Sequence, residues 1–330
     1  MNSTATQAVK EYGSRFRTVQ SPAVAIPFDA GNTRSVELPR SFLYKYLAFR
    51  LSGSVTLGTA TGPYNENPVG LIRRIDLIAD GRKLLWSIGG RDAFRLSQIM
   101  QGKRGEFDSA TAGTDPIAAS FLIHAEAVRM RLPIDSYFDP RPYEKIELRV
   151  QWGTVADLFT SPGTATISAA TALDVHIIQS AEGAPHIQFN RLLLFDEQVI
   201  AAASSALTFN VPRSGLLQGI LIRVDNAGAP TNDSLNFISL KSDNNFLHID
   251  RLAAATIRAR NVIEYSIDGT TTDSGLDGYY FVDLTEDGLM QSTLNTFDLN
   301  VLQLIMGASV PSATRTYRVT YIYFEPLTAA

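Results

Sequence analysis

Residues that could carry metal or acid–base chemistry are sparse in this sequence. No two of the four histidines are spaced as H-x-H or H-x-x-x-H, the patterns that bring two imidazoles onto one metal ion. These histidines are His124, His176, His186 and His248. The best fragment of an imidazole–carboxylate site is His124-Ala125-Glu126, which supplies too few ligands. We therefore expect no metal and no cofactor, and we interpret His176 and His248 as satisfied sheet residues.

Two pairs of carboxylates have the residue types that a glycoside hydrolase uses as its acid and base. They are Asp76 with Asp80 and Glu144 with Glu147. Strand and turn surfaces carry such pairs routinely, however. The sequence also contains no G-x-S-x-G, G-x-G-x-x-G or G-x-x-x-x-G-K-[ST] motif. The sequence therefore predicts no catalytic residue.

Composition narrows the class of protein further. The 330 residues are 45% hydrophobic and 19% charged, an ordinary globular balance. The net charge of −4 argues against a protein that grips nucleic acid mainly through a basic surface. Cysteine is absent, which excludes disulfides and thiolate sites. Because the first residues lack the apolar region of a signal peptide and no run reaches the roughly 20 apolar residues of a membrane helix, we expect a soluble protein made without Sec-type export.

A short sequence occurs twice, about half a chain apart. Leu38-Pro39-Arg40-Ser41 precedes an apolar run, and Val211-Pro212-Arg213-Ser214 precedes a second one 173 residues later, with Arg50 matching Arg223. Internal repeats have to be sought before the fold is argued. We expect Pro39 and Pro212 at equivalent positions of two units. Arg40 and Arg213 either mark the end of an edge strand or make the same contact in each unit.

Further matches follow in the same order. Asp80-Gly81 between two apolar runs predicts a type I′ hairpin, and Asp243-Asn244 matches it 163 residues later. A short helix is predicted over 90–101, ended by Gly102. A second helix is predicted over 251–260, with Asp250 as its N-cap.

Later strands extend the repeat towards the end of the sequence. Phe297–Ile305 is matched with Ile146–Trp152, so that Leu148 corresponds to Leu299. Thr316–Phe324 is matched with Ala172–Gln179, so that Val175 corresponds to Val319. Other expected segments are a polar loop over 103–116, a strand over 121–132, and a strand with or without a short helix over 191–203.

About eight short strands and one helix in each unit favour an all-β fold of two tandem jelly rolls, which are eight-stranded antiparallel sandwiches. No crossover helices separate the strands, which excludes an α/β fold. The predicted division is an N-terminal arm over 1–25, a first jelly roll over 26–180, a connector over 181–205 and a second jelly roll over 206–330.

With two such units, long loops, no cysteine and this length, the chain resembles the double jelly-roll major capsid proteins of tailless icosahedral viruses, especially bacteriophages. The resemblance implies a coat protein that is not an enzyme. It implies homotrimers that form pseudo-hexamers and tile an icosahedral shell. Other capsid proteins, such as penton or spike proteins, would be further partners, and there would be no small-molecule substrate. The protein would be part of the virion and be assembled in the host cytoplasm.

The arm and the loops take positions from the same resemblance. The arm would lie on the inner side of the shell, where Lys10, Arg15 and Arg17 meet an anionic membrane or the genome. The plainer interpretation of these residues is a frayed terminus. The loops over 58–68, 103–116 and 270–278 would lie on the outer surface or between subunits.

Two other functions remain open on the sequence. One is a carbohydrate-binding or receptor-binding two-domain β-protein, such as a spike, which should show an exposed aromatic cluster. The other is an enzyme on a double jelly roll, such as a glycan amidase or hydrolase, which should show a cleft with converging carboxylates. A coat protein should instead associate into trimers.

Overall fold

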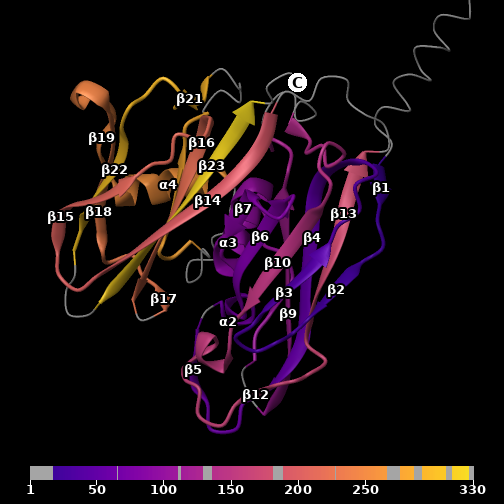
Figure 1. Ribbon diagram of the computed structural model, residues 1–330. Helices are drawn as coiled ribbons and strands as arrows, with labels where there is room; N and C mark the ends of the chain where they lie inside the picture. The colour runs from indigo at the N-terminus through magenta and orange to yellow at the C-terminus, as the bar shows by residue number, and fades with distance from the viewer. Residues whose placement is uncertain are drawn as a thin grey trace, which may run out of the picture.

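The computed structural model describes residues 18–64, 66–110, 113–128, 136–180, 189–226, 228–265, 276–285, 292–309 and 314–326. Two β-rich units lie side by side, with helix α3 (Gly90–Gln101) close to the boundary between them (Figure 1). Among the described residues, no helix is both long and apolar enough to cross a membrane.

The first unit is a jelly roll. Its main strands are β2 (Val24–Pro27), β3 (Thr33–Glu37), β4 (Leu43–Thr56), β6 (Ile72–Ala79), β7 (Lys83–Ile88), β9 (Thr114–His124), β10 (Ile146–Trp152) and β13 (Ala172–Ser180). They pair in the orders β2-β13-β4-β9 and β3-β10-β6-β7. Its smaller elements are β1 (Thr18–Gln20), β5 (Thr61–Pro63), α2 (Asn67–Gly70), β8 (Phe107–Asp108), η2 (Val155–Asp157), β11 (Phe159–Ser161) and β12 (Thr166–Ile167).

The second unit repeats this topology. Its main strands are β14 (Phe189–Ile200), β15 (Ser204–Asn210), β16 (Leu216–Asn226), β18 (Leu235–Ser242), β19 (Leu247–Ala253), β20 (Tyr279–Asp283), β22 (Leu302–Ala308) and β23 (Arg315–Pro326). They pair in the orders β14-β23-β16-β20 and β15-β22-β18-β19. Its other elements are β17 (Ala229–Pro230), η3 (Asp243–Asn245), α4 (Ala254–Glu264) and β21 (Leu294–Asn295). The predicted all-β fold of two tandem jelly rolls is confirmed.

The arginine of the repeated Pro-Arg-Ser sequence makes the same contact in both units. Arg40 donates to the carbonyl of Tyr143, and Arg213 donates to the carbonyl of Leu299 at 2.8 Å. Each carbonyl belongs to the segment that leads into the corresponding strand, β10 or β22. The carbonyl oxygens of Pro39 and Pro212 each accept a tyrosine hydroxyl. The shared sequence therefore ties the end of one strand to the loop before another.

The hairpin and the first helix form as expected, but the second helix is shifted. Asp80 and Gly81 adopt φ of 51° and 69°, as a type I′ turn requires. Helix α3 spans Gly90–Gln101 and ends at Gly102, which is left-handed. Helix α4 begins at Ala254, because Arg251 to Ala253 stay in β19, and the predicted cap Asp250 is wrong.

One register was predicted correctly and one was not. Val175 pairs with Phe49, and Val319 pairs with Ile222 of the equivalent strand, so that match is confirmed. The residue equivalent to Leu148 is Leu304, not Leu299, because Leu304 pairs with Leu240 as Leu148 pairs with Leu77. Residues 297–301 form a turn instead, in which Asp243 accepts the backbone N–H groups of residues 300 and 301.

Strands form in the three segments predicted as an arm, a polar loop and a connector. In the range predicted as the arm, β1 and β2 pair with β13, and Val24 and Ile26 turn inward from them. Strand β9 begins at Thr114, within the predicted loop over 103–116. In the predicted connector, β14 pairs along its whole length with β23, so the second jelly roll begins with β14, and residues 201–203 form a bend.

The two units share a sheet and a core. Strand β7 of the first unit meets β14 of the second in a parallel bridge at Trp86 and Leu193, which joins their sheets into one of ten strands. One cluster of buried apolar side chains runs through both units. The two jelly rolls therefore pack as one body.

We expect a difference between two glycine substitutions that impose the same backbone strain. Gly81→Ala places a side chain at φ 69° with no atom within 4 Å, whereas the added Cβ of Gly102→Ala lies 2.9 Å from the backbone oxygen of Tyr265 at φ 67°. Gly81→Ala should lower the free energy of unfolding by about 1 kcal/mol and Gly102→Ala by about 2 kcal/mol or more. Urea unfolding measures both, and equal losses would contradict the close contact.

Candidate functional site

The junction between the units is held by backbone and side-chain hydrogen bonds. The indole N–H of Trp86 donates to the carbonyl of Arg191 at 3.0 Å. The buried guanidinium of Arg191 in turn donates to the carbonyl of His124 at 3.0 Å. At the rim, Lys83 pairs with Glu325 at 2.8 Å. Together these contacts fix strand β14 against the first unit.

A buried cluster of charges crosses the same junction. Glu66 forms an ion pair with Arg95 and accepts the Tyr279 hydroxyl at 2.8 Å. Arg223 pairs with Asp225 at 2.7 Å and lies 3.5 Å from Asp92. Glu66, Asp92 and Arg95 come from the first unit, and the other three residues come from the second. The cluster therefore links the units by matched charges.

Burial and neighbouring arginines set the ionisation of this cluster. Burial raises the pKa of Asp92, and Arg223 and Arg318 only partly oppose that shift. Burial also pushes the pKa of Glu66 upward, but Arg95 and Arg223 overcome it and hold that pKa below its usual range. Glu66 is thus the anchoring anion of the junction.

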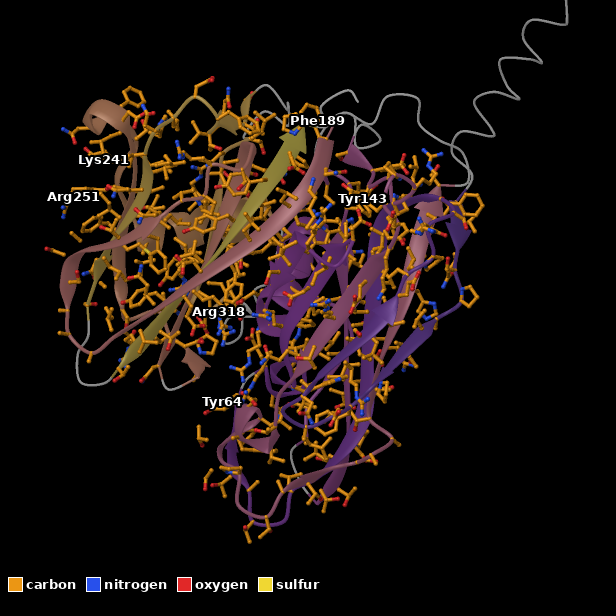
Figure 2. All side chains as sticks on the ribbon, viewed as in Figure 1. Tyr64, Tyr143, Phe189, Lys241, Arg251 and Arg318 are labelled. Carbon is orange, nitrogen blue, oxygen red and sulfur yellow. The ribbon has the colours of Figure 1, made fainter. Side chains whose placement is uncertain are left out.

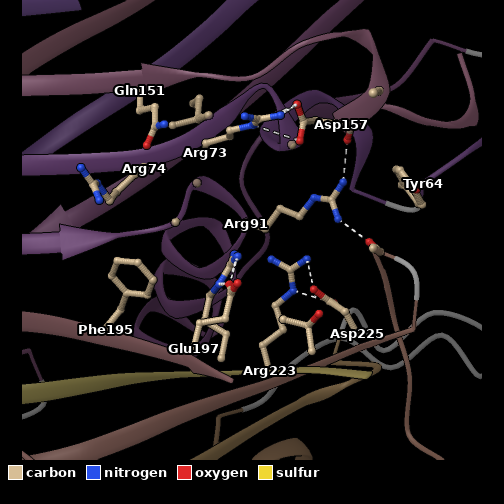
Figure 3. A pocket seen from close by; sticks show the side chains of 18 of the residues that line it. Tyr64, Arg73, Arg74, Arg91, Gln151, Asp157, Phe195, Glu197, Arg223 and Asp225 are labelled. Carbon is tan, nitrogen blue, oxygen red and sulfur yellow. Dashed lines mark hydrogen bonds and ion pairs between the residues drawn. The ribbon is translucent and has the colours of Figure 1, made fainter. Parts of the chain in front are cut away.

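A cleft of about 650 Å³ opens beside this cluster (Figure 3). Its charged lining consists of Arg73, Arg74, Arg91, Asp157, Asp196, Glu197, Arg223, Asp225 and Arg318. Its aromatic lining is Tyr64 and Phe195. Figure 2 shows Tyr64 on the first unit and Arg318 near the boundary between the units. Both units therefore contribute to the cleft.

Most arginines of the cleft are held by a carboxylate. Arg73 donates to Oδ2 of Asp157 at 3.0 Å and to Oδ1 at 3.2 Å. Arg223 pairs with Asp225, and Arg318 pairs with Glu197. These ion pairs hold the three arginine side chains against the lining of the cleft.

The two helices differ in what covers them. Eleven of the twelve residues of α3 are buried, and its Asp92 and Arg95 contact the second unit. Only Ala254, Ile257 and Asn261 are buried in α4. The outer side of α4 carries an exposed apolar stripe made of Ala255, Ala259, Val262 and Ile263. Ile263 is 78% exposed.

The equivalent strands β4 and β16 also differ in how far their outer faces are covered. Arg223 of β16 is buried against the first unit, with its side chain 4% exposed. Its repeat equivalent Arg50, on β4, is 57% exposed and pairs with Glu106 at the surface. Ala48 is half-buried, while its equivalent Leu221 is buried. The outer face of β4 in the first unit and the outer side of α4 in the second are therefore both more exposed than their equivalents in the other unit.

The residues singled out in the sequence do not converge. Lys10, Arg15, Arg17 and His186 lie outside the described residues. His124 contacts Gln101 and Glu126, His176 contacts Gln20, and His248 contacts Ser242. Asp80 accepts the backbone N–H groups of Glu144 and Lys145, Asp76 pairs with Arg74, and Glu147 pairs with Arg149. Within the described part of the chain, no group of three or more metal-ligating side chains gathers.

The arginines of the cleft were missed at the sequence level because nothing in their spacing sets them apart. Arg73, Arg91 and Arg223 come from a strand, a helix and another strand of two different units. The one available signal was that Arg223 repeats Arg50, which pointed to equivalence rather than to a site.

We expect Arg223 and Arg50 to respond differently to the same substitution. Arg223→Met leaves Asp225 buried without its cation and Asp92 with only Arg318 at 3.7 Å, which should cost about 3–5 kcal/mol of unfolding free energy. Arg50→Met removes only a surface pair and should cost less than about 1 kcal/mol. Urea unfolding of the full chain measures both, and similar losses would refute a stabilising role of the buried cluster.

Comparison with known proteins places the fold. No protein-family model matches the sequence, and no curated protein matches it significantly. The chain is similar to the crystal structure of the STIV MCP, with a TM-score of 0.74 and 14% identity over 93% of this chain and 97% of that chain. It is similar to a chain of the atomic structure of Sulfolobus turreted icosahedral virus, with a TM-score of 0.72 and 14% identity over 94% of this chain and 91% of that chain. It is also similar to the major capsid protein P2 of bacteriophage PM2, with a TM-score of 0.57 and 14% identity over 92% of this chain and 98% of that chain. The chain therefore has the double jelly-roll fold of viral major capsid proteins.

Proposed function

We propose that this protein is the major capsid protein of an icosahedral virus, a structural and non-enzymatic coat subunit. Its fold is that of capsid proteins over nearly the whole chain. The observation that carries the proposal is the contrast between α3, which the second unit covers, and α4, whose equivalent side is open and apolar.

In head-to-tail assembly, one side of a unit contacts a different side of the next unit. Such assembly requires an open side on the last unit of each chain, and α4 lies on such a side. Inside the chain, the α3 side of one jelly roll contacts the outer face of the next, through Asp92 and Arg223. The α4 side and the outer face around Arg50 are the two halves of the same kind of contact, left unused. Interfaces of this heterologous kind close into rings when the rotation permits. Three chains would then present six similar units, which is a pseudo-hexameric trimer suited to tiling a shell.

The trimer makes a prediction about α4. The purified chain should have the mass of a trimer by multi-angle light scattering. Ile263→Asp puts a charge on the apolar stripe and should shift the mass towards the monomer. Val199→Asp is the matched control, because Val199 is 60% exposed but lies on β14. A stable wild-type monomer would contradict the trimer, and so would an unchanged trimer of the Ile263 variant.

The head-to-tail arrangement makes a sharper prediction with two variants. Ala48→Glu should disrupt the outer face of the first unit, as Ile263→Asp disrupts the α4 side. Each variant alone should be monomeric, but an equimolar mixture retains one intact contact and should yield a 1:1 heterodimer. Native mass spectrometry with one isotopically labelled variant measures this. A face that contacts its own copy would give homodimers of one variant instead.

We infer a separate role for the arm, in which Lys10, Arg15 and Arg17 contact an anionic membrane or the genome on the inner side of the shell. The proposal rests on their charge. A deletion of residues 2–17 spares β1, which begins at Thr18. It should leave the trimer intact and reduce binding to anionic vesicles or to single-stranded DNA in co-sedimentation. Binding equal to that of the full chain to both would overturn this role.

Two further parts of the proposal concern the assembled particle. Contacts with other capsid proteins, such as penton or spike proteins, fit a lattice that must end at vertices. Assembly in the host cytoplasm fits a coat subunit without cysteine, which needs no oxidising compartment.

A further inference from the structure

A β-bulge aims two neighbouring arginines into the cleft between the units. Gln151 of β10 pairs with Arg74, and Trp152 pairs with Ile72, so Arg73 is the extra residue of β6. Neighbouring residues of a regular strand point to opposite faces, and a bulge re-aims one of them. Arg73 and Arg74 both line the cleft, and their side chains are 46% and 43% exposed. Both guanidinium groups are therefore accessible at its mouth.

Deeper in the cleft, Arg91 is buried without a direct ion pair among the described residues. Glu66 and Asp225 act on it from beyond ion-pair distance, and they are paired with Arg95 and Arg223. Arg91 is 7% exposed, and it donates to two neutral carbonyls, those of Gly228 at 2.5 Å and Asp157 at 2.7 Å. Its guanidinium also lies 5.0 Å from the centre of the Tyr64 ring. Within the described chain, no carboxylate lies within ion-pair distance of Arg91. Burial of a cation on these terms is unfavourable unless an anion accompanies it.

In the described chain, none of the four carboxylates that line the cleft forms an ion pair with Arg91. Asp157, Glu197 and Asp225 hold Arg73, Arg318 and Arg223, and Asp196 accepts the backbone N–H of Glu197. The lining has five arginines and four carboxylates, and Asp76 and Asp92, outside the lining, pair with Arg74 and with Arg223 and Arg318. The first turn of the twelve-residue helix α3 also lines the cleft, and its N-cap Gly89 makes no side-chain cap. Asp92 in the same turn already places a carboxylate at the positive end of this helix dipole.

The jelly-roll fold does not itself require these arginines. The second unit has the same topology, but its positions equivalent to Arg73, Arg74 and Arg91 are Asn236, Phe237 and Ala254. The comparison of the two units therefore indicates that the three arginines belong to this cleft and are not needed for the jelly-roll fold.

We propose that the cleft is a binding site for an oxyanion, one per chain, in which Arg91 binds the anionic group and Arg73 and Arg74 flank it. Planar guanidinium groups bind carboxylate, phosphate and sulfate through paired hydrogen bonds. A cleft of about 650 Å³ is large enough for a ligand that carries such a group on a larger body. The site lies within one chain and does not depend on ring formation.

Titration calorimetry on the full chain tests this proposal with inorganic phosphate, sulfate and glucuronate as probes. Wild type should bind at least one of them with a stoichiometry of one per chain. Arg74→Ala and Arg91→Lys should weaken that binding at least tenfold, whereas Arg34→Ala, at an exposed arginine of β3, should leave it unchanged. Tighter binding of phosphate or sulfate would indicate a phosphorylated or sulfated ligand, and tighter binding of glucuronate an acidic sugar.

Three results would overturn the site. They are the lack of saturable binding of all three probes, an affinity unchanged in Arg74→Ala, and an equal loss in Arg34→Ala. Arg74 is half-exposed and contacts Asp76 on its own strand, so Arg74→Ala is the variant least able to disturb the fold. Thermal melting of each variant shows whether it is folded. The mass of the oligomer, measured in parallel, reports separately on the proposed coat function.

Discussion

The arrangement of the two jelly rolls depends on one buried arginine. Arg223 lies in the second unit but is within ion-pair distance of Asp92 from the first unit as well as Asp225 from its own. Burying a charge costs folding free energy unless its partners are in place. Any other packing of the units would leave Arg223 buried without Asp92. The apolar contacts around it are tolerant of small shifts. The ion cluster, by contrast, selects a single orientation of the units, and the cleft and the open side of α4 both follow from that orientation.

Equivalent positions in the two units have opposite surroundings. Arg50 and Arg223 occupy equivalent positions of the equivalent strands β4 and β16, yet the first is in solvent and the second is buried. The helices show the same contrast, since α3 is covered and α4 is open. A chain of two like units always has one inner contact and two unmatched ends. The differences between the units are therefore concentrated where one unit has a neighbour and the other does not.

The sequence predicted the repeated parts of the fold well, because local signals were strong there. The hairpin at Asp80-Gly81 follows from turn chemistry, and α3 follows from apolar spacing and Gly102. The predicted register of β22 was wrong because the loop before this strand differs in length between the units. Phe297 and Val301 of that loop are exposed, but their apolar side chains look like part of a strand in the sequence. The cleft was out of reach, since it forms only when elements distant in the sequence meet.

The bridge between Trp86 and Leu193 joins the sheets of the two units edge to edge. Two jelly rolls connected only by a loop would be free to swing about it. Here the shared sheet and the shared core hold the two units together as one rigid body. In the shell that we propose, such rigid chains would be joined at an angle only where they contact one another, so the curvature of the shell would be determined by contacts from one chain to the next.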